Sequence, residues 1–261
     1  MKIIEKELEA IRNEIVSGFV DPLPSGAIFD FLSNGSKLIR STLGILYLKS
    51  QNITINNEII KILATGEIIH NSSLLHDDVL DNADTRRGKT VIAKTFSPKI
   101  SILAGDFLIS RAIEKLLELN NFTILTSFKE CTKKMAEAEI KQYFLRETIP
   151  TEEDYIDICT GKTANLFSKI LESCANLTNI STEQAKIFAQ NFGICFQIKN
   201  DLNKESALID KNNGIYTAKE ILGIEKTLVL LDNYKEEMRK LIENFPENIY
   251  KNELKDLINS L

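Results

Sequence analysis

The chain has 261 residues, of which 43% are apolar and 26% are charged, with only eleven glycines and five prolines. This composition is typical of a helical globule with a sizeable core and disfavours a β-sandwich or a disordered chain. The net charge of −5 leaves no basic footprint, so we expect no nucleic-acid partner.

Cysteine and histidine usage gives no sign of a zinc site or of disulfides. The four cysteines show no CxxC spacing, and the chain has two histidines. We therefore interpret the cysteines as small core residues in a reducing compartment. The acidic, amphipathic start does not look like a signal or transit peptide, and no apolar run approaches the ~20 residues that span a bilayer. We expect no transmembrane segment and a cytoplasmic location.

Helical periodicity dominates the chain, because apolar residues recur at three- and four-residue intervals. We expect helices over residues 2–19, 91–119, 121–147 and Ser181 to Lys204. A short helix is expected after Pro24, another opens at residues 33–40, a long one ends near residue 80, and one begins at Thr151. Two or three more are expected between residues 218 and 261. Residues 205–216 are predicted to form a loop. No strand of convincing length, fixed repeat or linker is evident, so the prediction is one all-α domain over residues 1–261.

The most informative stretch runs from His70 to Lys89 and contains Asp77, Asp78 and Asp81. On a helix, Asp77 and Asp81 lie on one face, about one turn apart. Two carboxylates so close repel each other unless a positive group lies between them. Mg²⁺, which takes one or two carboxylates plus phosphate oxygens, is the simplest candidate. The alternative is a solvated helix end whose aspartates pair with arginines.

Cationic side chains suited to phosphate occur close to this stretch and well before it. Arg86 and Arg87 follow the aspartates, and a guanidinium binds phosphate oxygens through paired hydrogen bonds. Gly88, next in the chain, would let the backbone turn there. Lys37 and Arg40 are predicted in the first turn of a helix beside Gly35, where the helix dipole disfavours cations. An anion is therefore expected there, with ordinary surface charge as the alternative.

Two further positions lie inside predicted helices. Gly105 costs ~1 kcal/mol against alanine in a helix, which predicts close packing against a neighbour. Lys162 is either a second phosphate contact or a lysine whose stem lies along the surface.

This combination of motifs resembles the trans-prenyltransferases, the isoprenyl (polyprenyl) diphosphate synthases of long-chain type. The resemblance covers roughly residues 35–217. It is carried by Gly35-x-Lys37-x-x-Arg40, Glu67-x-x-His70, SLLHDDVLDNADTRRG, Gly105-Asp106, Lys162-Thr163-Ala164 and Phe196-Gln197. It implies an isoprenoid synthase helical bundle around a central cavity. It also implies a homodimer that condenses isopentenyl diphosphate with an allylic diphosphate, with Mg²⁺ as cofactor, to give a longer all-trans polyprenyl diphosphate.

The resemblance also assigns roles to residues. Asp77 and Asp81 would bind Mg²⁺, with Asp78 as a supporting carboxylate, and Arg86 and Lys162 would neutralise the allylic diphosphate. The diphosphate of isopentenyl diphosphate would be held by Lys37, Arg40, His70 and Arg87. Gly35, Thr163 and Gln197 complete the implied substrate-binding set.

Product length is predicted from the residues one turn before the aspartates. Ser73 and Ser72 precede Asp77 by four and five positions, so their side chains are expected to share its face of the helix. In the family, bulky aromatic residues here close the pocket and give short products. The two serines predict a product of geranylgeranyl length or longer.

The second aspartate motif of the family, DDxxD, departs from its pattern in this chain. The positions read Asn200-Asp201-Leu202-Asn203-Lys204. Asn200 and Asp201 still offer oxygen ligands to Mg²⁺, although an amide attracts the ion less than a carboxylate does. Lys204 would either contact the diphosphate or abolish a metal site.

Three functional interpretations follow. We prefer an active long-chain synthase, with a catalytically weak prenyl-diphosphate-binding subunit of a heteromeric synthase as the alternative. A terpene cyclase would need a serine at Lys204 and a glutamate at Leu208, so that class is disfavoured.

Overall fold

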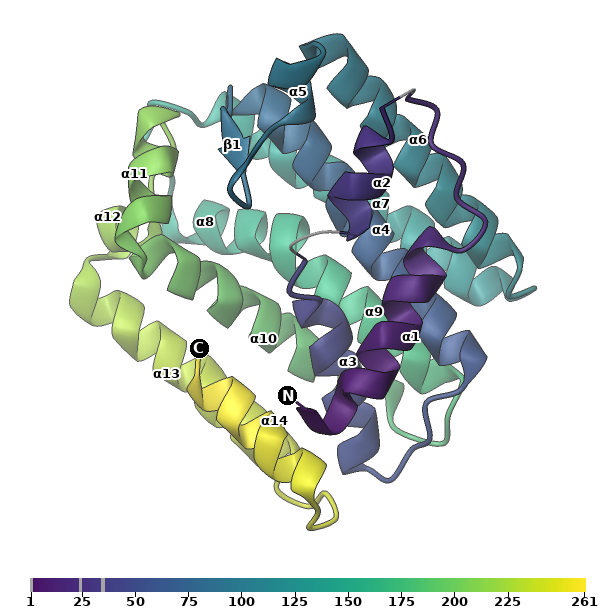
Figure 1. Cartoon of the computed structure of the whole chain (residues 1–261). Helices are drawn as coiled ribbons and strands as arrows, with labels where there is room; N and C mark the ends of the chain where they lie inside the picture. Colours follow the sequence, from purple (N-terminus) through teal and green to yellow (C-terminus); the bar gives the residue numbers. More distant parts are fainter. Residues whose placement is uncertain (1, 24, 34–35) are drawn as a thin grey trace. The chain divides into compact units, whose positions relative to one another are not determined.

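A computed structural model describes residues 2–23, 25–33 and 36–261, except the side chains of residues 204–206. Apart from one hairpin of two-residue strands, the secondary structure of these residues is helical (Figure 1). The predicted all-α class is therefore confirmed. None of the helices among these residues has the length and apolar character needed to cross a membrane.

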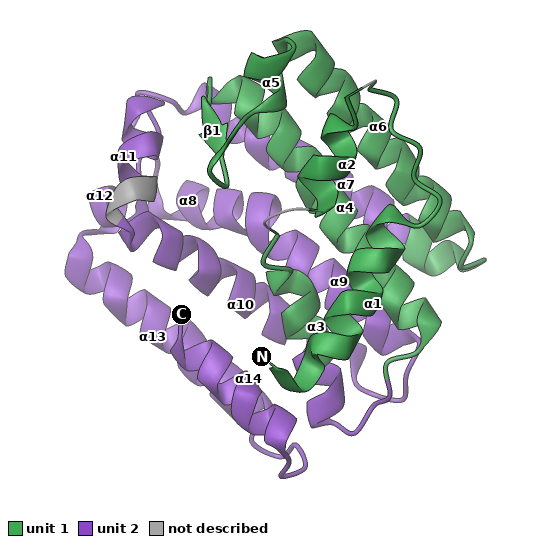
Figure 2. Cartoon of the chain, viewed as in Figure 1, with its two compact units in different colours: residues 1–45, 55–125 green, residues 46–54, 126–261 purple. Residues whose placement is uncertain are grey.

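The chain divides into two compact units (Figure 2). Unit 1 comprises residues 1–45 and 55–125, and unit 2 comprises residues 46–54 and 126–261. The boundaries fall within two helices, α3 and α7, and in the segment that leads into α4. A single domain over residues 1–261 stays a prediction.

The elements follow one another in a simple order. The first part of the chain contains η1 (Lys2–Ile4), α1 (Glu5–Val16), α2 (Ala27–Ser33), α3 (Ile39–Ser50), α4 (Asn57–Leu80), β1 (Thr85–Arg86), β2 (Lys89–Thr90), α5 (Ile92–Thr95) and α6 (Pro98–Leu117). The rest contains α7 (Phe122–Phe144), α8 (Glu152–Cys159), the π-helical turn η2 (Thr160–Ala164), α9 (Asn165–Asn176), α10 (Thr182–Leu202), α11 (Lys204–Asn212), α12 (Ala218–Leu222), α13 (Ile224–Leu241) and α14 (Ile249–Asn259).

Helix α4 is the central element of unit 1 and packs against α1 and α6. Ser72 Oγ donates a hydrogen bond to the Gly105 carbonyl at 2.8 Å, and Ser101 Oγ donates one to the Leu75 carbonyl at 2.9 Å. A Cβ atom at Gly105 would overlap the His76 ring. The close packing predicted from this glycine is confirmed, and it fixes the rotation of α4 about its axis.

The predicted helix over 91–119 is divided into α5 and α6. Ser97 has an extended backbone, and its side chain accepts a hydrogen bond from the Ile100 amide at 3.2 Å. Pro98 takes the first turn of α6, where its missing N–H costs nothing. This start signal interrupts an otherwise continuous apolar period.

Helix α10 is the central element of unit 2 and packs against α9, η2 and α13. Its Phe188 contacts Tyr47, with ring centroids 4.8 Å apart, and Tyr47 contacts Phe245 at 5.3 Å. The predicted start of α8 is confirmed, because Thr151 and Asp154 form a reciprocal capping box.

The loop predicted over 205–216 is wrong for most of its length, because α11 covers Lys204–Asn212. Leu208 and Ile209 are each 59% exposed. The described side chains of α11, from Ala207 on, therefore form no buried apolar stripe of the kind from which helices are recognised in a sequence.

The crossing of α10 over η2 depends on Gly193. A Cβ atom there would overlap the backbone Cα of Ala164. We predict that Gly193→Ala lowers the free energy of unfolding by ~1–3 kcal/mol, as overpacking does. The measurement is urea denaturation.

Gly44→Ala is the matched control. Its Cβ would lie 2.6 Å from Leu63 Cδ2, the far end of a flexible side chain, and alanine favours the helix by up to ~1 kcal/mol. An equal loss of unfolding free energy in the two variants would show that the α10–η2 contact tolerates a Cβ atom as well as the contact at Gly44 does.

Candidate functional site

One partly exposed face of α4 carries a residue predicted for substrate binding, one for product length and one for metal binding. His70, Ser73 and Asp77 are spaced by three and four residues and are each partly exposed. Asp81 is the C-cap of the helix, with its backbone N–H bonded to the Asp77 carbonyl at 2.9 Å. The helical spacing expected for Asp77 and Asp81 therefore holds to the end of α4.

Asp78 points away from this face and is 1% exposed. Its Oδ1 accepts a hydrogen bond from Arg86 Nε at 2.5 Å. Burial raises the pKa of the Asp78 carboxyl, and the Arg86 guanidinium opposes that rise. This ion pair attaches the hairpin to α4 and uses one of the five N–H donors of the guanidinium.

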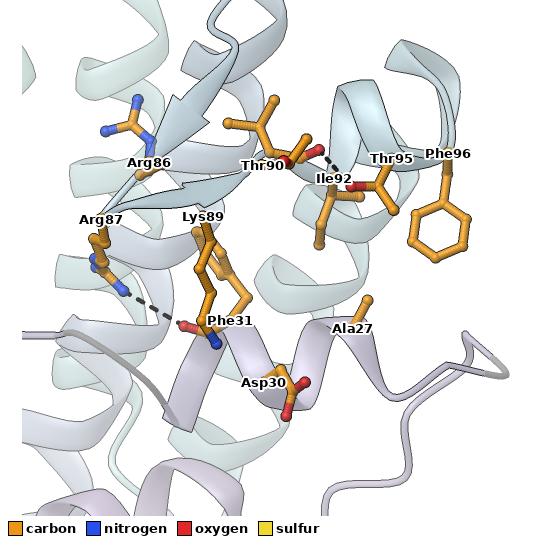
Figure 3. Close-up of a pocket in the computed structure, with 11 residues that line it drawn as sticks. Ala27, Asp30, Phe31, Arg86, Arg87, Lys89, Thr90, Ile92, Thr95 and Phe96 are labelled. Carbon is orange, nitrogen blue, oxygen red and sulfur yellow. Dashed lines mark hydrogen bonds between the residues drawn. The ribbon is translucent and has the colours of Figure 1, made fainter.

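The hairpin turns at the predicted glycine. Arg87 and Gly88 both have positive φ, at 53° and 76°, and this combination is typical of a tight two-residue hairpin. Arg87 Nη2 donates to Asn71 Oδ1 at 3.2 Å. Arg87 Nη1 donates to the Phe31 carbonyl at 3.4 Å (Figure 3). Asn71 is fully buried and was missed by the sequence reasoning, although a buried amide in an apolar helix signals a fixed partner.

The start of α3 differs from the prediction. Leu38 is buried with a φ of 46°, so the helix begins at Ile39 and leaves Lys37 before it, exposed. The Ser41 amide and hydroxyl both donate to Glu67 Oε1, at 3.0 and 2.9 Å. The anion expected at this helix start is thus, in part, a buried carboxylate of the protein itself. Gly35 lies outside the described residues.

His70 is surrounded by positive charge. Burial lowers the pKa of its imidazole well below the usual 6.5, and the charges of Arg40, Arg87 and Arg86 lower it further. Arg40 is itself only 6% exposed. A neutral imidazole beside three guanidinium groups is a favourable site for a polyanion.

A pocket of about 220 Å³ lies between α2, the hairpin and α5 within unit 1 (Figure 3). Arg86, Arg87 and Lys89 line it together with apolar side chains that include Phe31 and Phe96. The hairpin therefore has cationic groups both toward α4 and toward α2.

In unit 2, Lys162 lies in the π-helical turn η2. Its ammonium is 2.5 Å from Glu139 Oε2 and donates to Gln142 Oε1 at 2.8 Å. A Cβ at Gly161 would lie 2.6 Å from Ala138 Cβ, so this glycine allows η2 to approach α7. Lys162 is held in place by partners on α7, and π-helical turns of this kind are frequent at functional sites.

Thr163, Gln197 and Asp201 form a connected chain of hydrogen bonds. Thr163 Oγ1 donates to Gln197 Oε1 at 3.0 Å, and Gln197 Nε2 donates to Asp201 Oδ1 at 2.8 Å. Asp201 Oδ2 accepts from Tyr155 Oη at 2.8 Å and from the Ala218 amide at 2.9 Å. Tyr155 was missed by the sequence reasoning, because no local pattern connects it with Asp201.

The two serines predicted for product length differ in burial, and so do Asn200 and Asp201, which were predicted for the second metal site. Ser72 is fully buried against α6, so the prediction that it shares the face of Asp77 is wrong. Ser73 is partly exposed and donates to the His70 carbonyl at 2.9 Å. Asn200 is partly exposed and Asp201 is 4% exposed. The side chain of Lys204 lies outside the described residues.

The donor set at the end of α4 fits a magnesium ion. In the described part of the chain, no three His, Cys, Asp or Glu side chains converge as a metal-binding group. Asp77 and Asp81 supply two carboxylates, which is the number that a Mg²⁺ completed by water and phosphate oxygens takes from a protein. Asp201 fits poorly, because both of its oxygens already accept hydrogen bonds.

Residues 23–255 match the model of the polyprenyl synthetase family. The chain belongs to this family. It is 36% identical over 160 residues to an all-trans-nonaprenyl-diphosphate synthase (geranyl-diphosphate specific) of Rhodobacter capsulatus, and the match covers 59% of this chain and 49% of that relative. The chain spans 64%, 49% and 58% of the length of three curated relatives it matches.

Solved structures confirm the predicted isoprenoid synthase helical bundle. A polyprenyl synthase from Caulobacter crescentus CB15, complexed with calcium and isoprenyl diphosphate, has a TM-score of 0.89 at 22% identity, and the match covers 99% of this chain and 94% of that chain. A geranyltransferase from Helicobacter pylori, complexed with magnesium and isoprenyl diphosphate, has a TM-score of 0.79 at 20% identity, with coverage of 99% and 96%. The cavity at the centre of the bundle stays a prediction.

The lowered pKa of His70 predicts a pH dependence of stability. The unfolded chain binds a proton at this residue below about pH 6.5, whereas the folded chain binds it only at lower pH. Stability should therefore fall as pH falls below about 6.5, by at most ~1.4 kcal/mol per pH unit, and stop falling below the folded pKa.

The measurement is the free energy of unfolding between pH 7.5 and 5 for the wild type and for His70→Asn. The free energy of unfolding of the wild type should fall relative to that of His70→Asn as the pH falls. A difference that is constant with pH would contradict the account of His70.

Proposed function

We propose that the protein is a trans-prenyltransferase that condenses isopentenyl diphosphate with an allylic diphosphate to give a longer all-trans polyprenyl diphosphate. The observation that carries the proposal is the grouping of Arg40, Arg86 and Arg87 around His70, on the helix that also carries Asp77 and is capped by Asp81. An anion site beside a carboxylate pair suits two neighbouring diphosphates, one held by cationic side chains and one held through a metal ion. The family to which the chain belongs supports the same reaction.

The proposal includes Mg²⁺ as cofactor. Asp77 and Asp81 would hold it, and the ion when bound supplies positive charge to the departing diphosphate. Asp78 takes a supporting role through Arg86, which it orients at 2.5 Å. The Helicobacter pylori geranyltransferase, a structural neighbour, is complexed with magnesium, which is in keeping with this choice.

The cationic side chains bind and orient the two substrates. Lys37, Arg40, His70 and Arg87 hold isopentenyl diphosphate, and Arg86 holds the allylic diphosphate. The donors that hold the allylic diphosphate stabilise the negative charge that grows on it as its carbon–oxygen bond breaks. The isopentenyl double bond then attacks the allylic carbon, and the released diphosphate accepts the proton that is lost.

The unit 2 residues are proposed for the allylic substrate on the strength of the motif match. Lys162 would contact the diphosphate, exchanging its bond to Glu139 for one to phosphate. Thr163 and Gln197 would lie next to Lys162 and the diphosphate. Their mutual hydrogen bond orients both side chains.

For the assembly and location, we propose a homodimer in the cytoplasm. All four cysteines are buried and none forms a disulfide, as in a protein of a reducing compartment. A catalytically weak subunit that binds prenyl diphosphates for a partner synthase is the second candidate. One observation favours it: Asp201 is engaged in hydrogen bonds within the protein, and its neighbour Asn200 is an amide in place of a carboxylate, so this motif offers little to a metal ion.

Asp77→Ala tests the proposed metal site. The variant should lower the rate of elongation by ~10²-fold or more, because charge stabilisation at the leaving group is lost. Its free energy of unfolding should change by ~0.5 kcal/mol or less, since a partly exposed side chain contributes little packing. The measurement is turnover of labelled isopentenyl diphosphate at saturating Mg²⁺.

Asp84→Ala is the control for the same chemical change. Asp84 is 83% exposed at its side chain and pairs with Lys94 at 3.0 Å. Its turnover should match the wild type. Full turnover in Asp77→Ala would refute the proposed role of Asp77.

Ser73→Phe tests the proposed determinant of product length. We propose that Ser73 leaves room for a product of geranylgeranyl length or longer. A phenylalanine there should shorten the product by at least one isoprene unit and slow the first condensation less than the later ones. Products are separated by chain length, with Ser73→Ala as the control that keeps the space. An unchanged product distribution in Ser73→Phe would count against the assignment.

A further inference from the structure

Asp201 occupies the second position of the altered aspartate motif, and its surroundings differ from those of a metal ligand. The residue is 4% exposed. Its Oδ2 accepts hydrogen bonds from Tyr155 Oη and from the Ala218 amide, and its Oδ1 accepts one from Gln197 Nε2, all between 2.8 and 2.9 Å. Three donors from three segments of unit 2 therefore converge on one carboxylate. A cation could bind only after at least one of these bonds was broken and the side chain was exposed.

The partners of Asp201 are themselves fixed. Tyr155 lies on α8 and is 5% exposed. Ala218 is the first residue of α12, directly after Thr217, whose side chain forms a capping box with Glu220. The carboxylate thus joins α8 and the start of α12 to α10, and it is anchored on both sides.

The third partner transmits this order to η2. Because Asp201 binds the NH₂ group of Gln197, the carbonyl oxygen of that side chain is turned toward Thr163, and it accepts the Thr163 hydroxyl at 3.0 Å. Thr163 is the neighbour of Lys162 in η2. A rotated Gln197 amide would present N–H groups instead of an oxygen, so the direction of this bond depends on Asp201.

We propose that Asp201 and Tyr155 are positioning residues for the allylic substrate and that Asp201 is not a metal ligand. They fix the orientation of Gln197 and, through Thr163, the π-helical turn that carries Lys162. The part of this inference that concerns the substrate rests on the proposed function. The hydrogen-bond chain itself does not.

Two variants break the chain at different points. Tyr155→Phe removes one donor and keeps the ring. Asp201→Asn keeps the shape but replaces an acceptor oxygen by an NH₂ group, which must then face at least one of the three donors. Tyr47→Phe is the matched control, because Tyr47 is another fully buried tyrosine of unit 2 and does not belong to the chain.

The first measurement is the affinity for farnesyl thiodiphosphate, a poorly ionised allylic analogue, as a function of Mg²⁺ concentration. Tyr155→Phe should weaken binding by about tenfold, the effect of one hydrogen bond to a charged group, and Asp201→Asn by at least as much. The Mg²⁺ concentration at half-saturation should stay at the wild-type value in both variants. Tyr47→Phe should bind as the wild type does.

A second measurement needs no ligand. Exchange of the Gln197 side-chain NH₂ protons, followed by NMR, should be slow in the wild type and in Tyr47→Phe. It should be about tenfold faster in Tyr155→Phe and in Asp201→Asn, since the group that holds the amide is loosened or lost.

The outcomes separate the competing explanations. A rise in the Mg²⁺ half-saturation for Asp201→Asn alone would overturn the proposal and make Asp201 a metal ligand. Wild-type affinity and exchange in both variants would overturn the positioning role. If the wild type fails to bind the analogue, the proposed function fails, and the exchange measurement still decides whether the chain orients Gln197.

Discussion

The arrangement of unit 1 depends on holding three guanidinium groups close to one neutral imidazole. Because like charges repel, the three guanidinium groups need negatively charged partners within the protein. The buried carboxylates of Asp78 and Glu67 supply negative charge, since Asp78 pairs with Arg86 and the charge of Glu67 raises the pKa of Arg87. Burial of Arg87 and the charge of Arg86 together lower that pKa by more than Glu67 and Asp78 raise it. A bound polyanion would relieve the remaining repulsion, and this is the physical basis of the proposed diphosphate site.

The buried acids that balance these guanidinium groups also fix the start of α3 and the position of the hairpin. Glu67 binds the start of α3, and Asp78 binds the hairpin, so α4 organises both segments through buried acids. Both acids lie on the buried side of α4, while Asp77 lies on the partly exposed side. One helix thus carries carboxylates that stabilise the protein on its buried side and, on its partly exposed side, Asp77, which we propose as a metal ligand.

Sequence reasoning succeeded where the signal is local. The spacing of Asp77 and Asp81, the turn at Gly88 and the capping residue Thr151 follow from periodicity and backbone preference over a few residues. It was wrong for α11, whose apolar residues are exposed. It also placed Lys37 inside a helix, because nothing local announces the left-handed backbone of Leu38.

Long-range partners could not be predicted from the sequence. The pairing of Glu67 with Ser41 spans 26 residues, and that of Tyr155 with Asp201 spans 46. The motif positions around Asn200 predicted oxygen ligands by residue type alone, and residue type does not say which oxygens already accept hydrogen bonds. The roles proposed for Ser72 and Ser73 diverge for the same reason, since only the packing of α4 on α6 decides which serine is buried.

The most direct test of the proposed reaction is to incubate the purified protein with Mg²⁺, radiolabelled isopentenyl diphosphate and farnesyl diphosphate, and to separate the products by chain length. We expect a ladder that ends at geranylgeranyl length or longer and that disappears when the metal is chelated. Binding of farnesyl diphosphate without any elongation would contradict the proposed reaction and would favour a prenyl-diphosphate-binding subunit.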